Sequence, residues 1–210
     1  MKIKVCGLTR EDDIRLACKL GAWAIGLVLA EGSPRHLSLE RAAALRKSIP
    51  KKVLAVGVFE DATGPEVQAA VAACGLDAVQ LHGAWPSFFE ECSAQIWRGL
   101  GLSRGRVAPA ISTRARAVVV EPARTLADRR AGKKPTAEQQ AWAWAQAKTL
   151  RREDLLIIAA GGLTPGNVAA AIAASGCDAV DVSGGVESAP GVKDPAKLRA
   201  FFSAAGISVT

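Results

Sequence analysis

Residues 155–187, LLIIAAGGLTPGNVAAAIAASGCDAVDVSGGVE, contain two short apolar runs, at 155–160 and 179–182, separated by a helical pattern at 165–174. Runs this rich in Leu, Ile, Val and Ala are typical of parallel strands that are buried on both faces. Parallel neighbours need a crossover connection, and a helix that begins after Thr164, with a proline in its first turn, supplies it. The stretch therefore predicts a β-α-β unit of an α/β protein.

The same unit recurs along the chain. We predict strands at 3–6, 23–29, 53–59, 78–81, 95–100, 117–121, 155–160 and 179–182. Helices are predicted near 11–20, 39–48, 65–74, 86–94, 137–150, 165–174 and 195–203, with a short, weak helix near 106–113. Eight such units in 210 residues, with no Pro- or Ser-rich linker between them, favour a single-domain TIM (β/α)8 barrel over residues 1–210. A doubly wound open sheet, which needs no eighth strand, is the alternative.

Composition and charge exclude several classes of protein. Half of the residues are hydrophobic and 22% are charged, which indicates a globular chain. No apolar run reaches the ~18 residues of a membrane span, and the chain opens directly into a strand, so we expect a cytoplasmic protein without a signal peptide. Ten Lys or Arg lie between 98 and 134, opposed only by Glu121 and Asp128. Because no aromatic residue interleaves these cations, a solvated face or attraction of a small anionic substrate is favoured over nucleic-acid binding.

The cysteines and histidines do not form a metal or disulfide pattern. Five cysteines, at positions 6, 18, 74, 92 and 177, are widely spaced without a C-x-x-C pair, and His36 and His82 stand alone. We therefore expect reduced thiols and no metal site. A free cysteine is most often a small buried hydrophobe, and four of the five have this plain structural interpretation.

Cys6 differs from the other cysteines because it is the last residue of the first predicted strand. In a barrel of this kind, the loops that follow the strands build the active site at one end. The same end offers residues 31–35 after strand two, Glu60 and Asp61 after strand three, His82 after strand four and Glu121 at the end of strand six. The topology therefore predicts that a thiol and several ionisable groups meet around one cavity.

Two glycine-rich loops follow strands seven and eight. The first contains Gly161 and Gly162, and the second contains Ser183, Gly184 and Gly185. Glycines let backbone N–H groups approach an anion closely, a following helix N-terminus adds a favourable dipole, and these two loops hold phosphate in many barrels. We predict a phosphate-binding site here; the alternative is that the glycines only form tight turns.

Six motifs, taken in order, resemble the phosphoribosylanthranilate isomerase family of tryptophan biosynthesis. They are KVCGLTRED (4–12), GSPRHLS (32–38), VGVF (56–59), AVQLHG (78–83), AAGGLTPGNV (159–168) and DVSGGVESAPGVKD (181–194), and the likeness is weakest between 86 and 152. The resemblance implies an isomerase that converts N-(5′-phosphoribosyl)anthranilate to 1-(2-carboxyphenylamino)-1-deoxyribulose 5-phosphate. It also implies an acid/base Amadori rearrangement that needs no cofactor. A monomer or a homodimer, with a small phosphorylated substrate as its partner, is expected.

The resemblance also implies roles for individual residues. Cys6 matches the general base, which must act as a thiolate, and a nearby cation such as Arg35 would favour that form. Arg35 is expected to hold the anthranilate carboxylate or to orient the substrate, and Asp181 to bond a ribose hydroxyl. The family has an aspartate as general acid at the end of strand six, where this chain has Glu121. We expect Glu121 to be the acid, with Asp128 as the alternative.

The segment after strand six departs further from the family pattern. The expected Gly-x-Gly-Lys-x-Phe-Asp-Trp run is replaced by a longer, more basic loop over 122–136. The departure leaves two other hypotheses open: a catalytically impaired barrel that only binds a phosphosugar, and a related phosphosugar isomerase. Gln80 and His82 match the family motif without an assigned role, and Trp142 and Trp144 are interpreted as packing residues.

Overall fold

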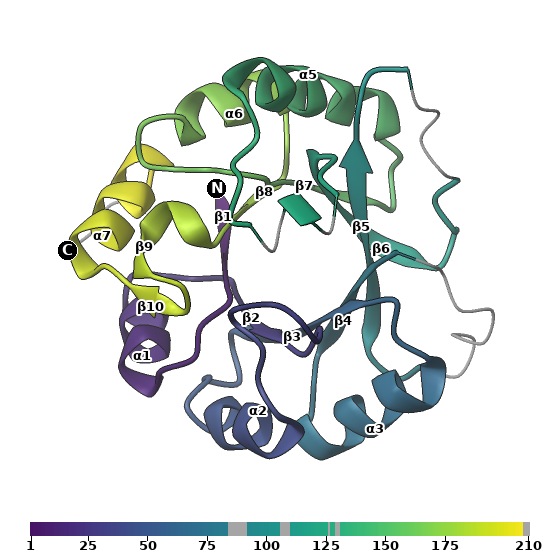
Figure 1. Ribbon diagram of the computed structural model, residues 1–210, viewed down its shortest axis with the longest axis vertical. Helices are drawn as coiled ribbons and strands as arrows, with labels where there is room; N and C mark the ends of the chain where they lie inside the picture. Colours follow the sequence, from purple (N-terminus) through teal and green to yellow (C-terminus); the bar gives the residue numbers. More distant parts are fainter. Residues whose placement is uncertain (84–91, 106–109, 126, 129–130, 208–210) are drawn as a thin grey trace.

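The computed structural model describes residues 1–83, 92–105, 110–125, 127–128 and 131–207. Eight parallel strands close into a barrel in sequence order, β1 pairing with β8 (Figure 1). They are β1 (Lys2–Cys6), β2 (Ala24–Val28), β3 (Leu54–Glu60), β4 (Ala78–His82), β5 (Gln95–Leu102), β6 (Ala115–Pro122), β7 (Leu156–Ala159) and β8 (Ala179–Val182). The predicted TIM barrel is confirmed, and the open-sheet alternative is wrong.

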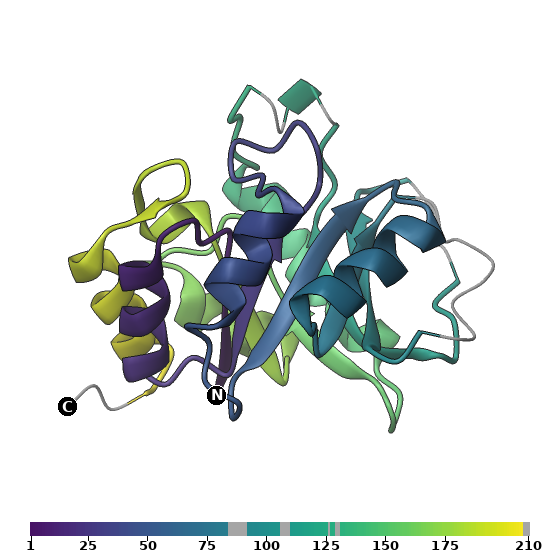
Figure 2. The same cartoon turned by 90° about the horizontal axis from the view of Figure 1, so that it is seen from below.

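Helices surround the barrel (Figures 1 and 2). They are α1 (Glu11–Lys19), α2 (Leu39–Arg46), α3 (Gly64–Cys74), α5 (Ala137–Ala147), α6 (Val168–Ser175) and α7 (Pro195–Ala204). The predicted helix at 86–94 lies mostly outside the described residues, and residues 110–113, the described part of the predicted 106–113 helix, are not helical. None of the described helices is long and apolar enough to cross a membrane.

Three helices begin at residues whose side chains cap them. The Ser38 side chain accepts a hydrogen bond from the Arg41 N–H, Thr63 forms a capping box at α3, and Asp194 caps α7. The start predicted at Thr164-Pro165 is wrong, because α6 begins at Val168. The Thr164 N–H donates instead to the Asn167 side chain at 2.7 Å, which holds these residues as a turn.

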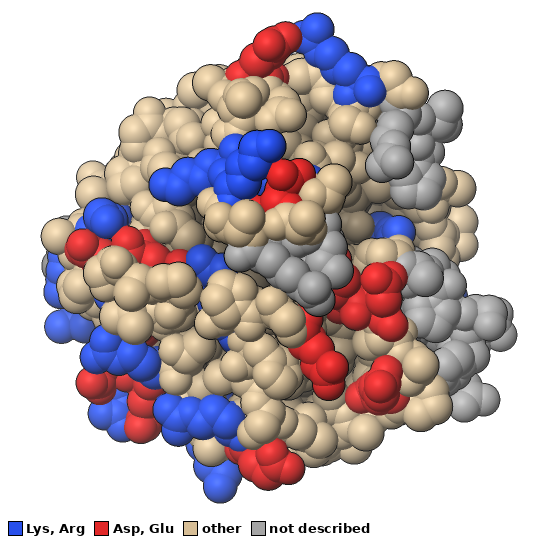
Figure 3. Space-filling view, in the orientation of Figure 1, with Lys and Arg blue, Asp and Glu red and all other residues tan. Residues whose placement is uncertain are grey.

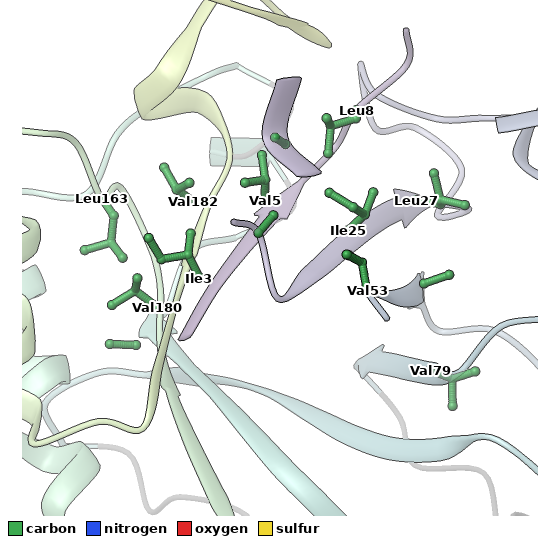
Figure 4. Packing of buried hydrophobic residues seen from close by; sticks show 14 of the residues in the cluster. Ile3, Val5, Leu8, Ile25, Leu27, Val53, Val79, Leu163, Val180 and Val182 are labelled. Atoms are coloured by element: carbon green, nitrogen blue, oxygen red, sulfur yellow. The ribbon is translucent and has the colours of Figure 1, made fainter. Parts of the chain in front are cut away.

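Successive side chains of a strand point alternately outward and inward, which gives the barrel two apolar layers. Outward-facing side chains such as Ile3, Val5 and Ile25 pack against the helices in the larger core (Figure 4). Inward-facing residues form a second cluster inside the barrel, where Trp97 stacks on Trp23 with ring centroids 5.3 Å apart. Because apolar side chains fill the interior near the strand starts, polar groups concentrate at the carboxyl ends.

Two small elements follow β8 that the sequence analysis did not predict. A 3-10 turn, η3 (Gly184–Val186), leads into an antiparallel ribbon of β9 (Glu187–Ala189) and β10 (Val192–Lys193). A second 3-10 turn, η2 (Lys148–Leu150), extends α5. The ribbon contacts the loop after β1, where the Thr9 hydroxyl donates to the Gly191 carbonyl at 2.8 Å.

Candidate active site

A cavity of about 670 Å³ opens at the carboxyl ends of the strands. This volume is in the range of small-molecule sites. The wall contains the residues that the sequence analysis favoured for the site, namely Cys6, Arg35, Glu121, Gly161, Gly162, Asp181, Ser183, Gly184 and Gly185, but not Asp128, the alternative acid. Residues up to 179 positions apart therefore meet in one place because closure of the barrel joins the first strand to the last.

Cys6 lies at the end of β1 with its side chain inside the barrel. Gly26 on β2 makes room for it, since a Cβ on Gly26 would lie 2.6 Å from the Cys6 Sγ. Burial raises the pKa of the Cys6 thiol, while the positive charges of Lys4 and Lys193 oppose that rise. The sequence analysis suggested Arg35 as the favourable cation, but the two lysines act more strongly on the thiol.

Lys4 is the nearest charged neighbour of Cys6 along β1. The two residues are two positions apart in one strand, so both side chains point into the barrel. Lys4 is fully buried, and its Nζ donates to Asp181 Oδ2 at 2.7 Å. Burial raises the pKa of Asp181, and the Lys4 charge opposes it. Lys4 therefore gives Asp181, an acidic residue inside an apolar strand, a buried partner.

The other Asp181 oxygen has no such partner. Oδ1 of Asp181 and Oε1 of Gln80 are buried, and neither is hydrogen-bonded to any described residue. Both residues line the cavity. Buried acceptors are rarely left unpaired in native proteins, so these two oxygens are suited to bond hydroxyl or N–H groups of a ligand.

A second ion-pair network holds Arg35 and the ribbon after β8. Arg35 donates to both carboxylate oxygens of Glu187, from Nε at 2.8 Å and from Nη2 at 2.5 Å. Lys193, also buried, donates to Glu187 Oε1 at 2.7 Å and to the Cys6 carbonyl at 2.7 Å. These bonds lower the pKa of Glu187, although burial opposes them. The network ties the end of β1 to the β9–β10 ribbon.

The glycine loops after β7 and β8 line the cavity. Gly161 and Gly162 have positive φ angles of 86° and 79°, and their carbonyls accept from Gln140 Nε2 at 3.1 and 3.0 Å. No described residue accepts a hydrogen bond from the N–H of Gly162, Gly184 or Gly185. The helix predicted at 195–203 is present as α7, but the residues directly after Ser183 form only the three-residue turn η3, so the donors available at this loop are amides rather than a long helix dipole.

Glu121 ends β6 on another part of the wall. Its Oε1 lies 3.7 Å from His82 Nδ1, and its Oε2 lies 3.7 Å from Arg124 Nη2. Gly99 leaves room for the His82 ring, and Gln80 Nε2 lies 2.8 Å from His82 Nε2. These distances to Glu121 exceed hydrogen-bond length, so its carboxyl group is surrounded by partners without being tightly bonded.

The contacts of Asp128, in the described part of the loop after β6, differ from those of Glu121, the other carboxylate considered as the general acid. Asp128 accepts from the Thr125 hydroxyl at 2.7 Å and pairs with Lys133 at 3.3 Å. The Thr125 bonds lower the pKa of Asp128. Asp128 is thus occupied in its own turn, whereas Glu121 lines the cavity. Trp144, in α5, is buried and donates to the Ala160 carbonyl at 2.8 Å, which agrees with its interpretation as a packing residue.

Charges of both signs surround the cavity mouth. Figure 3 shows acidic side chains gathered on the side of β3 and β4, with Lys and Arg side chains elsewhere on that face. Arg35, Arg124 and Lys134 contribute cations to the cavity wall. The last two come from the basic 98–134 segment, so part of that charge faces the site rather than bulk solvent.

The sequence analysis did not identify Lys4, Glu187 and Lys193 as residues of the site. Lys193 and Glu187 lie in a stretch that gives no strand signal, and their partners are far away in the sequence. Lys4 had a detectable signal, because a lysine two residues before Cys6 in an apolar strand shares its inward face.

Comparisons with known proteins identify the family. A family model described as N-(5′-phosphoribosyl)anthranilate (PRA) isomerase matches residues 3–204. The chain is 39% identical to the N-(5′-phosphoribosyl)anthranilate isomerase of Myxococcus xanthus, over 98% of this chain and 96% of that one. It is similar to the Thermus thermophilus phosphoribosyl anthranilate isomerase structure, with a TM-score of 0.79, 34% identity and coverage of 97% and 98%. A phosphoribosyl anthranilate isomerase in complex with reduced 1-(o-carboxyphenylamino)-1-deoxyribulose 5-phosphate matches with a TM-score of 0.76, 27% identity and 98% coverage of both chains.

Proposed function

Since the chain belongs to the N-(5′-phosphoribosyl)anthranilate isomerase family and is an isomerase of tryptophan biosynthesis, we propose that Cys6 is its general base and Glu121 its general acid. The two side chains face one cavity, from β1 and from β6, beside unpaired glycine amides. That juxtaposition is the observation that carries the assignment. It supplies the acid, the base and the anion cradle that an Amadori rearrangement of a phosphorylated aminosugar requires.

The first step is opening of the ribose ring. Glu121 donates its proton to the ring oxygen as the bond from that oxygen to C1′ breaks, and the nitrogen lone pair forms a Schiff base with C1′. A general acid works when it reaches the reacting atom and carries its proton near neutral pH. The loose contacts of Glu121 leave its carboxyl group free to turn toward the substrate.

The second step is removal of the C2′ proton by the Cys6 thiolate. The electron pair of the C2′–H bond moves to form a C1′–C2′ double bond, which discharges the Schiff base and gives an enolamine. Protonation at C1′ and loss of the hydroxyl proton at C2′ then give the ketone product, so that atoms and charge balance. Lys4 favours the thiolate electrostatically and holds Asp181, whose unpaired Oδ1 is proposed to accept from a ribose hydroxyl.

The phosphate group is proposed to bind at the glycine loops. Gly162, Gly184 and Gly185 line the cavity, and their N–H groups have no acceptor among the described residues, while Gly161 and Ser183 complete the loops. Arg35 lies beside this end, because a Cβ on Gly184 would be 3.2 Å from Arg35 Nη2. Held by Glu187, Arg35 is pre-organised to orient the substrate or to contact its carboxylate.

Rescue of a tryptophan auxotroph that lacks this step tests the function. The wild-type gene should restore growth without tryptophan, and a gene carrying both Cys6→Ala and Glu121→Gln should not. Absence of rescue by a wild-type protein that is present and folded would favour an impaired phosphosugar-binding barrel instead. The cytoplasmic location and a monomeric or dimeric state stay predictions.

A further inference from the structure

We propose that Lys193, on β10, is a positioning residue that fixes the separation between the general base Cys6 and the phosphate loop after β8. This role rests on the proposed function and deepens it, because it presupposes that Cys6 removes the C2′ proton and that the loop holds the phosphate. The Lys193 side chain is fully buried and does not line the cavity. Lys193 therefore acts through the residues that it holds and not on the substrate.

The Lys193 ammonium group joins the ends of the first and the last strand. Its Nζ donates to the Cys6 carbonyl at 2.7 Å and to the Ser183 carbonyl at 3.3 Å. The third bond goes to Glu187 Oε1 at 2.7 Å, so every N–H group of the ammonium is used. Cys6 is the last residue of β1, and Ser183 directly precedes the glycines of the phosphate loop. One nitrogen atom thus connects the base to the loop.

The Lys193 backbone is held by a separate contact. Its N–H donates to Asp13 Oδ2 at 3.0 Å, and Asp13 is a buried residue of α1. The loops that Lys193 connects are also close to each other, since a Cβ on Gly7 would lie 3.1 Å from Ser183 Oγ. The connection is therefore short, buried and anchored at its backbone, which leaves the base and the loop little freedom to move apart.

The chemistry of the substrate requires such a fixed separation. The phosphate is attached at C5′ and the proton leaves from C2′, so the ribose carbons between them determine how far from the phosphate the base must lie. A misplacement of roughly 1 Å can cost about a hundredfold in rate. Lys193 sets this separation before the substrate binds, because both of its carbonyl partners belong to the protein.

The charges near Cys6 support the same role. The described groups around the thiol are three cations and two carboxylates, namely Lys4, Arg35, Lys193, Asp181 and Glu187. Lys4 pairs with Asp181, whereas Arg35 and Lys193 share Glu187. Within this group one positive charge is left without a carboxylate, and a thiolate at Cys6 balances it. Burial raises the pKa of the Cys6 thiol, and Lys4 and Lys193 oppose that rise.

Two uncharged variants separate the charge of Lys193 from its hydrogen bonds. Lys193→Met removes both, and Lys193→Gln removes the charge but keeps an N–H donor. Lys197→Met is the matched control, because Lys197 donates to the Glu187 carbonyl at 2.9 Å and has no hydrogen bond to Cys6 or Ser183. Circular dichroism verifies that each variant is folded.

Three quantities are measured for each variant. They are kcat, the affinity for reduced 1-(o-carboxyphenylamino)-1-deoxyribulose 5-phosphate by calorimetry, and the pH profile of Cys6 alkylation by iodoacetamide. Lys193→Met should lower kcat by about 10- to 100-fold, because the base is displaced from C2′, while the affinity stays within about threefold. Its alkylation profile should move to higher pH, since loss of the cation raises the pKa of the thiol. Lys193→Gln should show the same move with a smaller loss of kcat, and Lys197→Met should change none of the three.

Unchanged kcat in folded Lys193→Met would overturn the proposal, and so would a loss of affinity as large as the loss of kcat. An unchanged alkylation profile would overturn it too, because a lysine that only stabilises the fold does not affect the thiol. If neither uncharged variant folded, Lys193 would be required for the fold itself, and the proposal would fall. Cys6→Ala is assayed alongside: if it kept its kcat, the proposed function would fail, a result distinct from normal turnover in Lys193→Met alone.

Discussion

The β1–β8 side of the cavity and the β4–β6 side are built in opposite ways. On the first side, the charged groups of Lys4, Asp181 and Lys193 are buried and hydrogen-bonded at 2.7 Å. On the second side, the contacts to Glu121 are 3.7 Å long, and buried atoms of Gln80 and Arg124 have no described partner. On the first side the charged groups already have partners, although Asp181 Oδ1 is left to a ligand, whereas the contacts of Glu121 on the second side are long.

This difference assigns separate tasks to the two walls. Buried ion pairs are costly to assemble, but once formed they hold a geometry that resists change. The β1–β8 side can therefore fix the base and the phosphate loops. Groups whose bonds form only with the reacting substrate lower the barrier most, because they stabilise the transition state more than the ground state. The loosely held Glu121 on the β4–β6 side meets that requirement.

Removal of the base should have the largest effect. Cys6→Ala should abolish measurable turnover while the affinity for the reduced product analogue stays within about tenfold, since general-base catalysis contributes roughly 10²- to 10⁴-fold. Single-turnover assays and calorimetry measure the two quantities. If the variant kept more than a few per cent of kcat, Cys6 would be only a packing residue on the β1–β8 side.

Removal of the acid should have the next largest effect, and it tests the task assigned to the β4–β6 side. Glu121→Gln should lower kcat by at least about a hundredfold, because the amide cannot donate an acidic proton to the ring oxygen. Asp128→Asn is the control, since Asp128 is bonded to Thr125 in its own turn. The opposite pattern of losses would move the general acid into the loop.

A bulkier residue in the phosphate loop should affect binding more than chemistry. Gly184→Val should raise KM by more than about tenfold with a smaller change in kcat, because its side chain would block close approach to the backbone N–H groups. Gly166→Val is the control, since a Cβ there meets only the Thr164 Oγ1 at 3.8 Å. A crystal grown in phosphate with the anion bound elsewhere and not in this cradle would contradict the assignment.

The smallest effect on the maximal rate is expected from Lys4→Gln, which alters the pH dependence. Lys4 lowers the pKa of Cys6, so its removal raises that pKa and moves the rise in thiolate reactivity to higher pH. Alkylation of Cys6 by iodoacetamide, followed by mass spectrometry across pH, measures the shift. Lys2→Gln removes the same charge from the exposed start of β1 and should leave the profile in place. If Lys4→Gln left the pH profile of Cys6 alkylation unchanged, Lys4 would have no influence on the pKa of the thiol.

Local patterns were sufficient to predict the strands and most helices. Uniform apolar runs determined β7 and β8 to within two residues, and strand ends located Cys6 and Glu121 at the cavity. These features depend on neighbours in the sequence and on one topological rule. The family motifs added specific roles for these residues, which remain to be tested.

The partners of the site residues could not be predicted in the same way. Lys4 pairs with Asp181 across 177 positions, and Lys193 reaches the Cys6 carbonyl across 187. Such contacts depend on the register in which the barrel closes, which no local pattern specifies. The ribbon containing Glu187 was also missed, because a three-residue strand beside Gly and Pro resembles a loop.

The Lys4–Asp181 pair has a consequence for biosynthesis of the protein. A ribosome adds roughly 5–20 residues per second, so β8 emerges on the order of ten seconds or more after β1. Throughout this interval Lys4 lacks its carboxylate, and a barrel that buried it early would trap an uncompensated charge. Hydration of that ammonium group therefore disfavours premature collapse of the nascent chain around β1. Docking of the last strand neutralises the lysine and closes the ring in one event, so the enzyme matures only when its final β-α unit has been made.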